Sequence, residues 1–374
     1  MKVLVLFPDS ISQPIGGLGI QFKHIYEQLK DKIDFYVVGY PDNNPGIKNY
    51  REAKNPILEV QHGTIITLLG HSIYFAEALK FPKPDIIHAY DWTTYYAGLL
   101  LSQHYNIPLL LTMQLSSNAL ATVGIYNCND INTIDGYYLH KAHIETEWLT
   151  LQKADKIISV SNGYNKYFPS LKDKTVTIPN GINLNEWIPN KKIIFPGDSN
   201  NIKVVYIGRF ASMKGIDLIL SAEIPKGIDI IFIGSSDGGD KHIIQSIEDK
   251  INNHPNFHYI GPAYGQDKIN KLCSADAVII PSYHEPFGIV GLESLASKCI
   301  TISSRVDGLG DYLNDSNSLH CGNTSIGITN SLKTLKLLSQ EHKEKLIFNG
   351  LETCKNYSWD EIADKYYNEY ISLF

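Results

Sequence analysis

The sequence predicts an α/β protein with two halves, each a parallel β-sheet covered by helices. Short apolar segments alternate with segments of helical periodicity from the start of the chain, beginning with Val3-Leu-Val-Leu-Phe7. The alternation stops at the turn Pro179-Asn-Gly181 and resumes at Lys203-Val-Val-Tyr-Ile207. Alternating strands and helices favour parallel sheets with helices on both faces. The length of 374 residues also fits about two domains of ~150 residues each.

Each half has a predicted order of elements. In the first half we expect strands at 3–7, 34–38, 85–89, 108–113 and 156–160, and helices at 20–29, 93–103 and 139–153. In the second half we expect strands at 203–207, 229–233, 256–260, 277–281 and 300–303, and a final aromatic helix at 359–373. The polar segment 189–201 contains two prolines and is predicted to be a linker. The predicted domains are therefore 1–188, 189–356 and a C-terminal segment 357–374.

The composition is that of an ordinary globular protein, and it argues against several classes of protein. The net charge of −6 gives no indication of a nucleic-acid partner. No apolar run approaches the ~18 residues of a membrane span, and an apolar strand follows Met1 and Lys2 directly. The five cysteines are scattered without C-x-x-C spacing, which argues against a zinc site and a disulfide framework. We therefore expect no transmembrane segment, no signal peptide and a cytoplasmic location.

Two carboxylates lie eight residues apart in Glu285-Pro-Phe-Gly-Ile-Val-Gly-Leu-Glu293, directly after the predicted strand 277–281. Pro286 suits the first position of a helix because its φ is fixed and it has no N–H, so a helix is predicted to begin there. The amides of the next three residues would then face a phosphate at the positive end of the helix. In a continuous helix, at ~1.5 Å per residue, the two carboxylates would lie roughly 12 Å apart, enough to bracket a diphosphate. The spacing alone is equally compatible with a capping acid and a solvated Glu on an amphipathic helix.

Two other loops offer groups that bind phosphate. The glycines of Pro14-Ile-Gly-Gly-Leu-Gly19 follow the first strand and allow the backbone to approach a phosphate, although a structural turn explains them equally well. The pattern G-x-G-x-x-G is not met, which argues against a dinucleotide-dependent oxidoreductase. The segment Ile207-Gly-Arg-Phe-Ala-Ser-Met-Lys-Gly215 supplies Arg209 and Lys214. Arg can grip a phosphate with two hydrogen bonds and Lys adds a compact charge, whereas an isolated pair of this kind is more often solvated.

Polar and aromatic residues also follow the carboxyl ends of two predicted strands in the first half. Asp91 and Trp92 follow the strand 85–89, and Gln114 follows the strand 108–113. Open α/β sheets bind ligands at the carboxyl ends of their strands, and a carboxylate beside an aromatic ring suits a polyol. A helix N-cap followed by a packed Trp explains the first two residues equally well. Gln114 can donate and accept hydrogen bonds but carries no positive charge at neutral pH.

In this order, the motifs resemble those of retaining glycosyltransferases with the GT-B fold in families four and five, which include glycogen and starch synthases. The resemblance covers nearly the whole chain. It rests on the Gly-Gly-Leu loop, the Asp-Trp segment, the Gly-Arg…Lys-Gly element and the E-x7-E motif. Three positions depart from the pattern: Pro14 replaces a usual Lys of glycogen and starch synthases, Tyr90 replaces a second His, and Gln114 replaces a common His. The resemblance implies two Rossmann-like domains with parallel sheets facing a central cleft, and a C-terminal helix that braces the first domain.

The resemblance also implies an activity and a set of site residues. The expected reaction moves a hexose, with glucose and UDP favoured, from a nucleoside diphosphate sugar to a hydroxyl of a sugar or glycan, with retention. The implied catalytic residues are Arg209, Lys214 and Glu285. The implied donor-binding residues are Gly17, Leu18, Gly208, Gly234, Phe287, Gly288, Ile289 and Glu293, and the implied acceptor-side residues are Asp91, Trp92 and Gln114. No metal and no other cofactor is expected, because fixed cations would neutralise the departing diphosphate.

Other functions remain open at this point. A protein of the same fold could bind a sugar nucleotide or glycan without turnover. This alternative stays open because Gln114 stands where relatives commonly have His. An epimerase and a phosphorylase share the fold, although a phosphorylase normally carries lysine-bound pyridoxal phosphate. The nearly equal numbers of basic and acidic residues in the first half favour a soluble acceptor over a lipid one.

Overall fold

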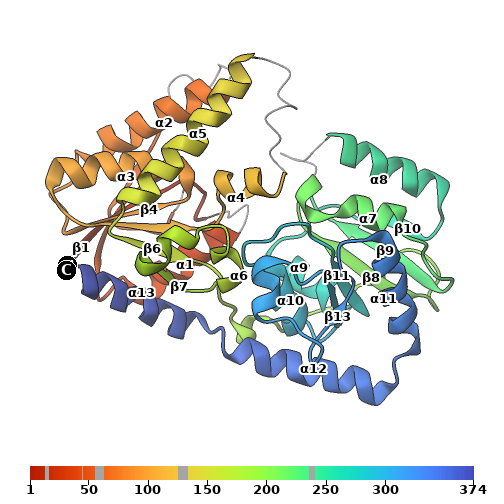
Figure 1. Ribbon diagram of the computed structural model, residues 1–374. Coiled ribbons are helices and arrows are strands. Elements are labelled where there is room, and N and C mark those ends of the chain that lie inside the picture. The colour runs from red at the N-terminus through yellow and green to blue at the C-terminus, as the bar shows by residue number, and fades with distance from the viewer. Residues whose placement is uncertain (13–16, 44, 55–62, 125–133, 236–240) are drawn as a thin grey trace. The chain divides into compact units, whose positions relative to one another are not determined.

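The computed structural model of the protein describes residues 1–12, 17–43, 45–54, 63–124, 134–235 and 241–374 (Figure 1). The chain forms two compact units. Unit 1 comprises Met1–Asn180 and Trp359–Phe374, and unit 2 comprises Gly181–Ser358. Each unit contains one parallel sheet with helices, which confirms the predicted α/β class. The sequence put the first boundary between residues 188 and 189, whereas the contacts divide the chain between Asn180 and Gly181.

Unit 1 has a seven-stranded sheet with the order β3-β2-β1-β4-β5-β6-β7. Its strands are β1 (Lys2–Phe7), β2 (Asp34–Gly39), β3 (Tyr50–Glu52), β4 (Ile86–Tyr90), β5 (Leu109–Met113), β6 (Lys156–Ser159) and β7 (Thr175–Thr177). Its helices are α1 (Gly17–Leu29), α2 (Gly63–Ala78), α3 (Trp92–Tyr105), α4 (Ser117–Thr122), α5 (Ile134–Lys153), α6 (Asn162–Asn165), the 3-10 turn η2 (Pro169–Lys174) and α13 (Trp359–Leu373). The strands predicted for this half are all present. The edge strands β3 and β7 were missed because each has three residues, all partly exposed.

Unit 2 has a six-stranded sheet with the order β10-β9-β8-β11-β12-β13. Its strands are β8 (Ile202–Ile207), β9 (Ile228–Ile233), β10 (Phe257–Tyr259), β11 (Ala277–Ile280), β12 (Ile300–Ser303) and β13 (Leu319–His320). Its helices are α7 (Ile216–Ser221), α8 (Lys241–Asn253), α9 (Gly265–Leu272), α10 (Ile289–Ala296), α11 (Ser325–Leu337) and α12 (Gln340–Lys355), and its 3-10 turns are η3 (Leu184–Glu186), η4 (Ser212–Lys214) and η5 (Asp307–Asp311). The segment 189–201, predicted to be a linker, belongs to unit 2. Its amides at Asn190 and Ile193 donate to Asn270 Oδ1 and Ser274 Oγ at 3.0 and 2.9 Å.

Both faces of the sheet in unit 1 are buried. In β1, Val3 and Val5 pack in one apolar cluster, while Leu4 and Leu6 pack in the cluster on the opposite face. A strand buried on both faces is apolar at nearly every position, which explains the apolar runs in the sequence. The strand order reverses between β1 and β4 in unit 1 and between β8 and β11 in unit 2. Ligands of such sheets bind beyond the carboxyl ends of the strands at these points.

Among the helices of the described ranges, none is long and apolar enough to cross a lipid bilayer. The last helix, α13, packs in the core of unit 1, beside α1 (Figure 1). Five of its side chains are buried: Trp359, Ile362, Ala363, Tyr366 and Tyr370. The Tyr370 hydroxyl lies 2.7 Å from His88 Nδ1, and Thr112 Oγ1 lies 2.7 Å from His88 Nε2. His88 is fully buried on β4, so a polar contact joins the helix to the sheet within the apolar core.

His88 should make the free energy of unfolding decrease as the pH falls. Burial lowers the pKa of His88 to about 3, whereas an unfolded chain binds this proton near pH ~6.5. Below that pH the unfolded state gains a proton that the folded state lacks, so stability falls by up to about 1.4 kcal/mol per pH unit until about pH 3. Asp91 and Glu147 act in the opposite direction, because burial raises the pKa of each to about 7.

A variant isolates this contribution from the opposing ones. Urea unfolding of wild type and His88→Gln between about pH 6.5 and pH 4.5 should show that stability declines less with acid in the variant. The same pH dependence in both proteins would mean that His88 takes up its proton in the folded state.

Candidate active site

The loops that follow β8 and β11 meet where the strand order of unit 2 reverses. Lys214, at the end of η4, places Nζ 2.6 Å from Glu285 Oε2. Ser282 Oγ donates to the same oxygen at 3.3 Å. The loop backbones are also joined, because the Tyr283 amide donates to Met213 O at 2.9 Å. Two predicted catalytic residues, 71 positions apart in the sequence, are therefore in contact.

Arg209 lies in the same loop as Lys214, and its side chain is exposed. Its carbonyl oxygen accepts a hydrogen bond from the Tyr206 hydroxyl at 2.8 Å. Burial raises the pKa of Tyr206, the charge of Glu285 raises it further, and the charge of Arg209 lowers it. Arg209 and Glu285 therefore lie near the same phenol. Within the described ranges no carboxylate forms an ion pair with Arg209, so its guanidinium is available to an anion.

Gly208 and Gly234 bring the ends of β8 and β9 close together. The Gly208 amide donates to Ile233 O at 3.0 Å, and the Gly234 amide donates to Gly261 O at 3.2 Å. A Cβ atom at Gly234 would lie 2.1 Å from Gly208 O. A side chain at Gly234 would therefore push the two loops apart, which explains the need for glycine there.

The helix after Glu285 begins later than the sequence predicts. Helix α10 starts at Ile289, and Gly288 is its N-cap with a left-handed φ of 83°. The prediction that Pro286 opens the helix was therefore wrong. The Tyr312 hydroxyl donates to Gly288 O, which holds this residue in its non-helical conformation. Because the segment is not one continuous helix, the estimate of roughly 12 Å between the two carboxylates, which assumed ~1.5 Å per residue, does not apply.

The start of α10 nevertheless presents backbone donors. In the described part of the chain, no group accepts a hydrogen bond from the amides of Phe287, Gly288 or Ile289. Amides at the first turn of a helix face the positive end of its dipole. These three residues therefore offer a favourable place for an anion.

Glu293 lies on α10 with its side chain almost fully buried, and Lys268 of α9 forms an ion pair with its Oε1. Lys268 was not among the residues predicted from the sequence. It is one of several lysines on an amphipathic helix, and the neighbouring Lys271 forms an ordinary i,i+4 pair with Asp267. No local pattern distinguishes the lysine that faces Glu293 from the one that faces Asp267.

In unit 1, Asp91 and Trp92 lie at the carboxyl end of β4. Asp91 caps α3, since its Oδ1 accepts the Trp92 amide at 2.8 Å. The Trp92 ring packs against His143, with ring centroids 5.0 Å apart. This is the N-cap and packed Trp that the sequence left open as an alternative. Asp91 also has φ 61° and ψ 157°, a strained conformation of the kind that clusters at functional sites.

Gln114, at the end of β5, forms a reciprocal amide pair with Asn180. Its Nε2 donates to Asn180 Oδ1 at 3.0 Å, and Asn180 Nδ2 donates to Gln114 Oε1 at 3.2 Å. Asn180 was predicted only to belong to a turn, and its contact with Gln114 was not predicted. Gln114 is therefore held in one orientation by a buried partner.

The glycine loop after β1 is described in part. Gly17 and Leu18 open α1, and the Gly19 amide donates to Asp9 Oδ2 at 3.1 Å. Pro14 and the other residues of 13–16 lie outside the described residues.

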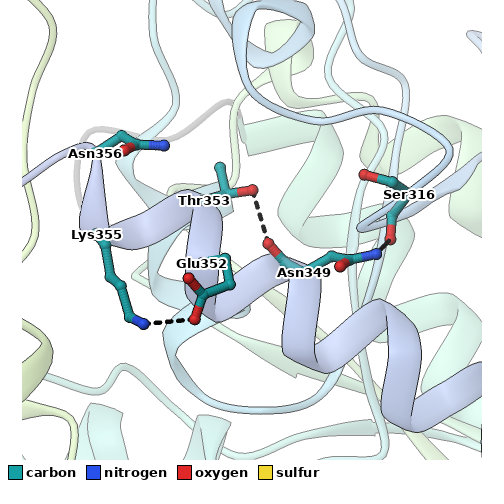
Figure 2. Close-up of a pocket in the computed structure, with 6 residues that line it drawn as sticks. All are labelled: Ser316, Asn349, Glu352, Thr353, Lys355 and Asn356. Carbon is teal, nitrogen blue, oxygen red and sulfur yellow. Dashed lines mark hydrogen bonds and ion pairs between the residues drawn. The ribbon is translucent and has the colours of Figure 1, made fainter.

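Figure 2 shows a polar pocket on the surface of unit 2, beside the end of α12. It is lined by Ser316, Asn349, Glu352, Thr353, Lys355 and Asn356. Its side chains bond to neighbours: Asn349 Nδ2 donates to Ser316 O at 2.8 Å, and Lys355 pairs with Glu352. None of the predicted site residues lines it.

Two family models match the chain, one in each half. The model described as Glycosyltransferase Family 4 matches residues 15–186, and the model described as Glycosyl transferases group 1 matches residues 189–352. An uncharacterized glycosyltransferase of Methanocaldococcus jannaschii is 28% identical over 370 residues, covering 96% of this chain and 95% of that protein.

Solved structures share the fold. Sucrose-phosphate synthase from Thermosynechococcus elongatus has a TM-score of 0.82 at 20% identity, covering 100% of this chain and 99% of that one. HepE from Anabaena, solved in complex with UDP-glucose, has a TM-score of 0.77 at 16% identity, covering 99% of this chain and 100% of that one. The two family models follow each other along the chain in the order that the sequence motifs predict. The chain therefore belongs to the GT-B glycosyltransferases, with a Family 4 amino-terminal half and a group 1 carboxy-terminal half.

Proposed function

We propose that this glycosyltransferase moves a hexose, preferably glucose, from a UDP-sugar to a hydroxyl group of a sugar or glycan, with retention of anomeric configuration. The observation that carries the proposal is the contact between Lys214 and Glu285, with Arg209 in the same loop as Lys214. The complex of HepE with UDP-glucose supports uridine and glucose as the first donor to test.

The proposed chemistry breaks the bond between the anomeric carbon and the β-phosphate oxygen. The electron pair leaves with UDP, the acceptor oxygen forms the new bond, and its proton passes to the departing phosphate. Positive groups aimed at the developing charge lower the barrier, typically by several kcal/mol in a site that excludes water. Lys214, Arg209 and the amides at the start of α10 supply such groups. The proposed reaction therefore requires neither a metal nor another cofactor.

The remaining predicted residues have proposed roles in binding. Glu285 accepts hydrogen bonds from sugar hydroxyls and Glu293 from the ribose, since an ionised carboxylate is an acceptor only. In this proposal the backbones of Gly17, Leu18, Gly208 and Gly234 also line the donor site, and Asp91, Trp92 and Gln114 contact the acceptor. The described cysteines are free thiols, which supports a cytoplasmic location.

Nucleotide binding tests the donor site. In the presence of a chelator, UDP should raise the unfolding temperature, because a ligand at ~100 times its Kd adds about 2.7 kcal/mol to stability. The shift should be lost in Glu293→Ala and kept in Glu352→Ala, which removes an exposed, ion-paired glutamate of the same unit. If UDP, ADP and GDP all left the unfolding temperature unchanged, the proposed donor site would be wrong.

Turnover then separates the enzyme from the alternatives. Wild type should release UDP from UDP-glucose in the presence of sugar acceptors, and NMR of the product should show the anomeric configuration of the donor. Binding without turnover for any acceptor would favour an inactive sugar-nucleotide binder. An altered free sugar in place of a glycoside would favour an epimerase.

A further inference from the structure

The loop after β12 holds the backbone of Glu285 on both sides. The Glu285 amide donates to Asp307 Oδ2 at 3.1 Å, and the Gly308 amide donates to Glu285 O at 3.1 Å. Asp307 therefore accepts from the N–H of Glu285, and the next residue, Gly308, donates to its C=O. Glu285 is the residue that contacts Lys214. Glu285 cannot rotate about its backbone without breaking at least one of these bonds.

His284 extends this arrangement into the core. Its ring is fully buried, and its Nδ1 lies 2.6 Å from the same Oδ2 atom of Asp307, whose side chain is 2% exposed. The separation of 2.6 Å places the imidazole directly against this carboxylate. One buried carboxylate oxygen therefore contacts the side chain of His284 and accepts a hydrogen bond from the main chain of Glu285.

Asp307 occupies a position where its backbone would favour glycine. Its φ is 44°, in the left-handed region, so glycine would relieve strain there. The next residue, Gly308, leaves no room for a side chain, because a Cβ atom would lie 2.1 Å from Pro286 O. The loop is therefore pressed against the Glu285–Pro286 turn, and the feature that aspartate adds over glycine is its carboxylate.

We propose that Asp307 is a positioning residue of the active site, which with His284 holds Glu285 in place for its contact with Lys214. The inference rests on the proposed function of Glu285 in turnover. A catalytic group that is already held in its reactive position does not have to move during the reaction. Displacing such a group by a small distance lowers the rate of the reaction substantially.

The Asp307→Gly variant separates positioning from turn formation. The variant should fold, because glycine suits the backbone, with a Tm below that of wild type since the Glu285 amide loses its acceptor. Its kcat with the donor should nevertheless fall about 10-fold, since Glu285 loses its backbone partner. Asp307→Asn keeps an acceptor oxygen and tolerates a left-handed φ, so it should restore kcat to within about 3-fold of wild type.

Arg305 provides a matched control in the same loop. It also has a left-handed φ, 54°, but its guanidinium bonds to Asp315 Oδ1 at 2.6 Å and to Ser318 O at 2.7 Å. Arg305→Gly should therefore retain the kcat of wild type. A loss of kcat equal to that of Asp307→Gly would show that any change in this loop disturbs the site, and would overturn the specific role of Asp307.

Hydrogen exchange tests the inference without any substrate. In the unliganded protein, the amide of Glu285 should exchange faster in Asp307→Gly than in wild type or Arg305→Gly, measured in peptides that span residues 282–288. If wild type turned over no UDP-hexose, the proposed function would fail and this measurement would still decide the positioning role. Equal exchange in Asp307→Gly and wild type would overturn the inference, whatever the activity.

Discussion

The Lys214→Met variant is expected to lose about 10²- to 10³-fold in kcat, the usual effect of removing one group that stabilises developing negative charge. Methionine keeps the apolar stem of lysine and removes only its charged end, so the packing of η4 should be preserved. The measurement is the steady-state release of UDP from the donor at saturating acceptor. A kcat within about 3-fold of wild type would contradict the role of Lys214 at the diphosphate.

A second substitution shows how Lys214 acts. The Nζ of Lys214 contacts Glu285, so the loss could arise from a misplaced Glu285 and not from the diphosphate. If Lys214 acts only by holding Glu285, Lys214→Met should cost nothing further in a Glu285→Gln background. We expect a further loss of at least about 10-fold, because a charge aimed at the departing phosphate acts independently of the sugar contacts.

Lys355 is the matched control for this experiment. It also pairs with a glutamate of unit 2, Glu352, but both side chains are largely exposed. Such pairs contribute about 0–1 kcal/mol to stability, and Lys355 lies outside the proposed site. Lys355→Met should therefore change neither kcat nor the unfolding temperature appreciably.

The sequence predicted the elements whose signals are local. Strands such as β11 are buried along their whole length and read as continuous apolar runs, so each was found near its position. The three-residue strands β3 and β7 lie at the edges of the sheet and have no such run. The start of α10 was misplaced because Pro286 satisfies the local rule for a first helical residue, while contacts from Tyr312 and Gly308 fix a different turn.

The contacts that orient the site residues depend on the tertiary structure. No local sequence pattern distinguishes Lys268 or Asp307, and only the fold shows that they touch Glu293 and Glu285. The pairing of Gln114 with Asn180 is similarly invisible, since 66 residues separate them. The motifs therefore predict which residues face the proposed substrates, and the fold was needed to identify the residues that contact those predicted ones.

The Tyr370→Ala variant should destabilise unit 1 by about 3–5 kcal/mol, the usual cost of removing a fully buried aromatic side chain. Tyr370 has no exposed surface and packs near Phe35 and His88, with ring centroids 6.2 and 5.5 Å away. The chain returns to unit 1 through residues 359–374, and the buried face of α13 packs this segment into the core. Urea unfolding followed by near-ultraviolet circular dichroism measures the loss.

Two further variants divide that cost between packing and hydrogen bonding. Tyr370→Phe keeps the ring but leaves the buried His88 Nδ1 without its hydroxyl partner, which should cost about 1–3 kcal/mol. Ile371→Ala changes the next residue, which is 49% exposed, and should stay within about 0.5 kcal/mol of wild type. If Tyr370→Ala were as mild as Ile371→Ala, the helix would not be held by its buried face. If Tyr370→Phe were as severe as Tyr370→Ala, the contact with His88, and not the apolar packing, would be what attaches α13 to the sheet.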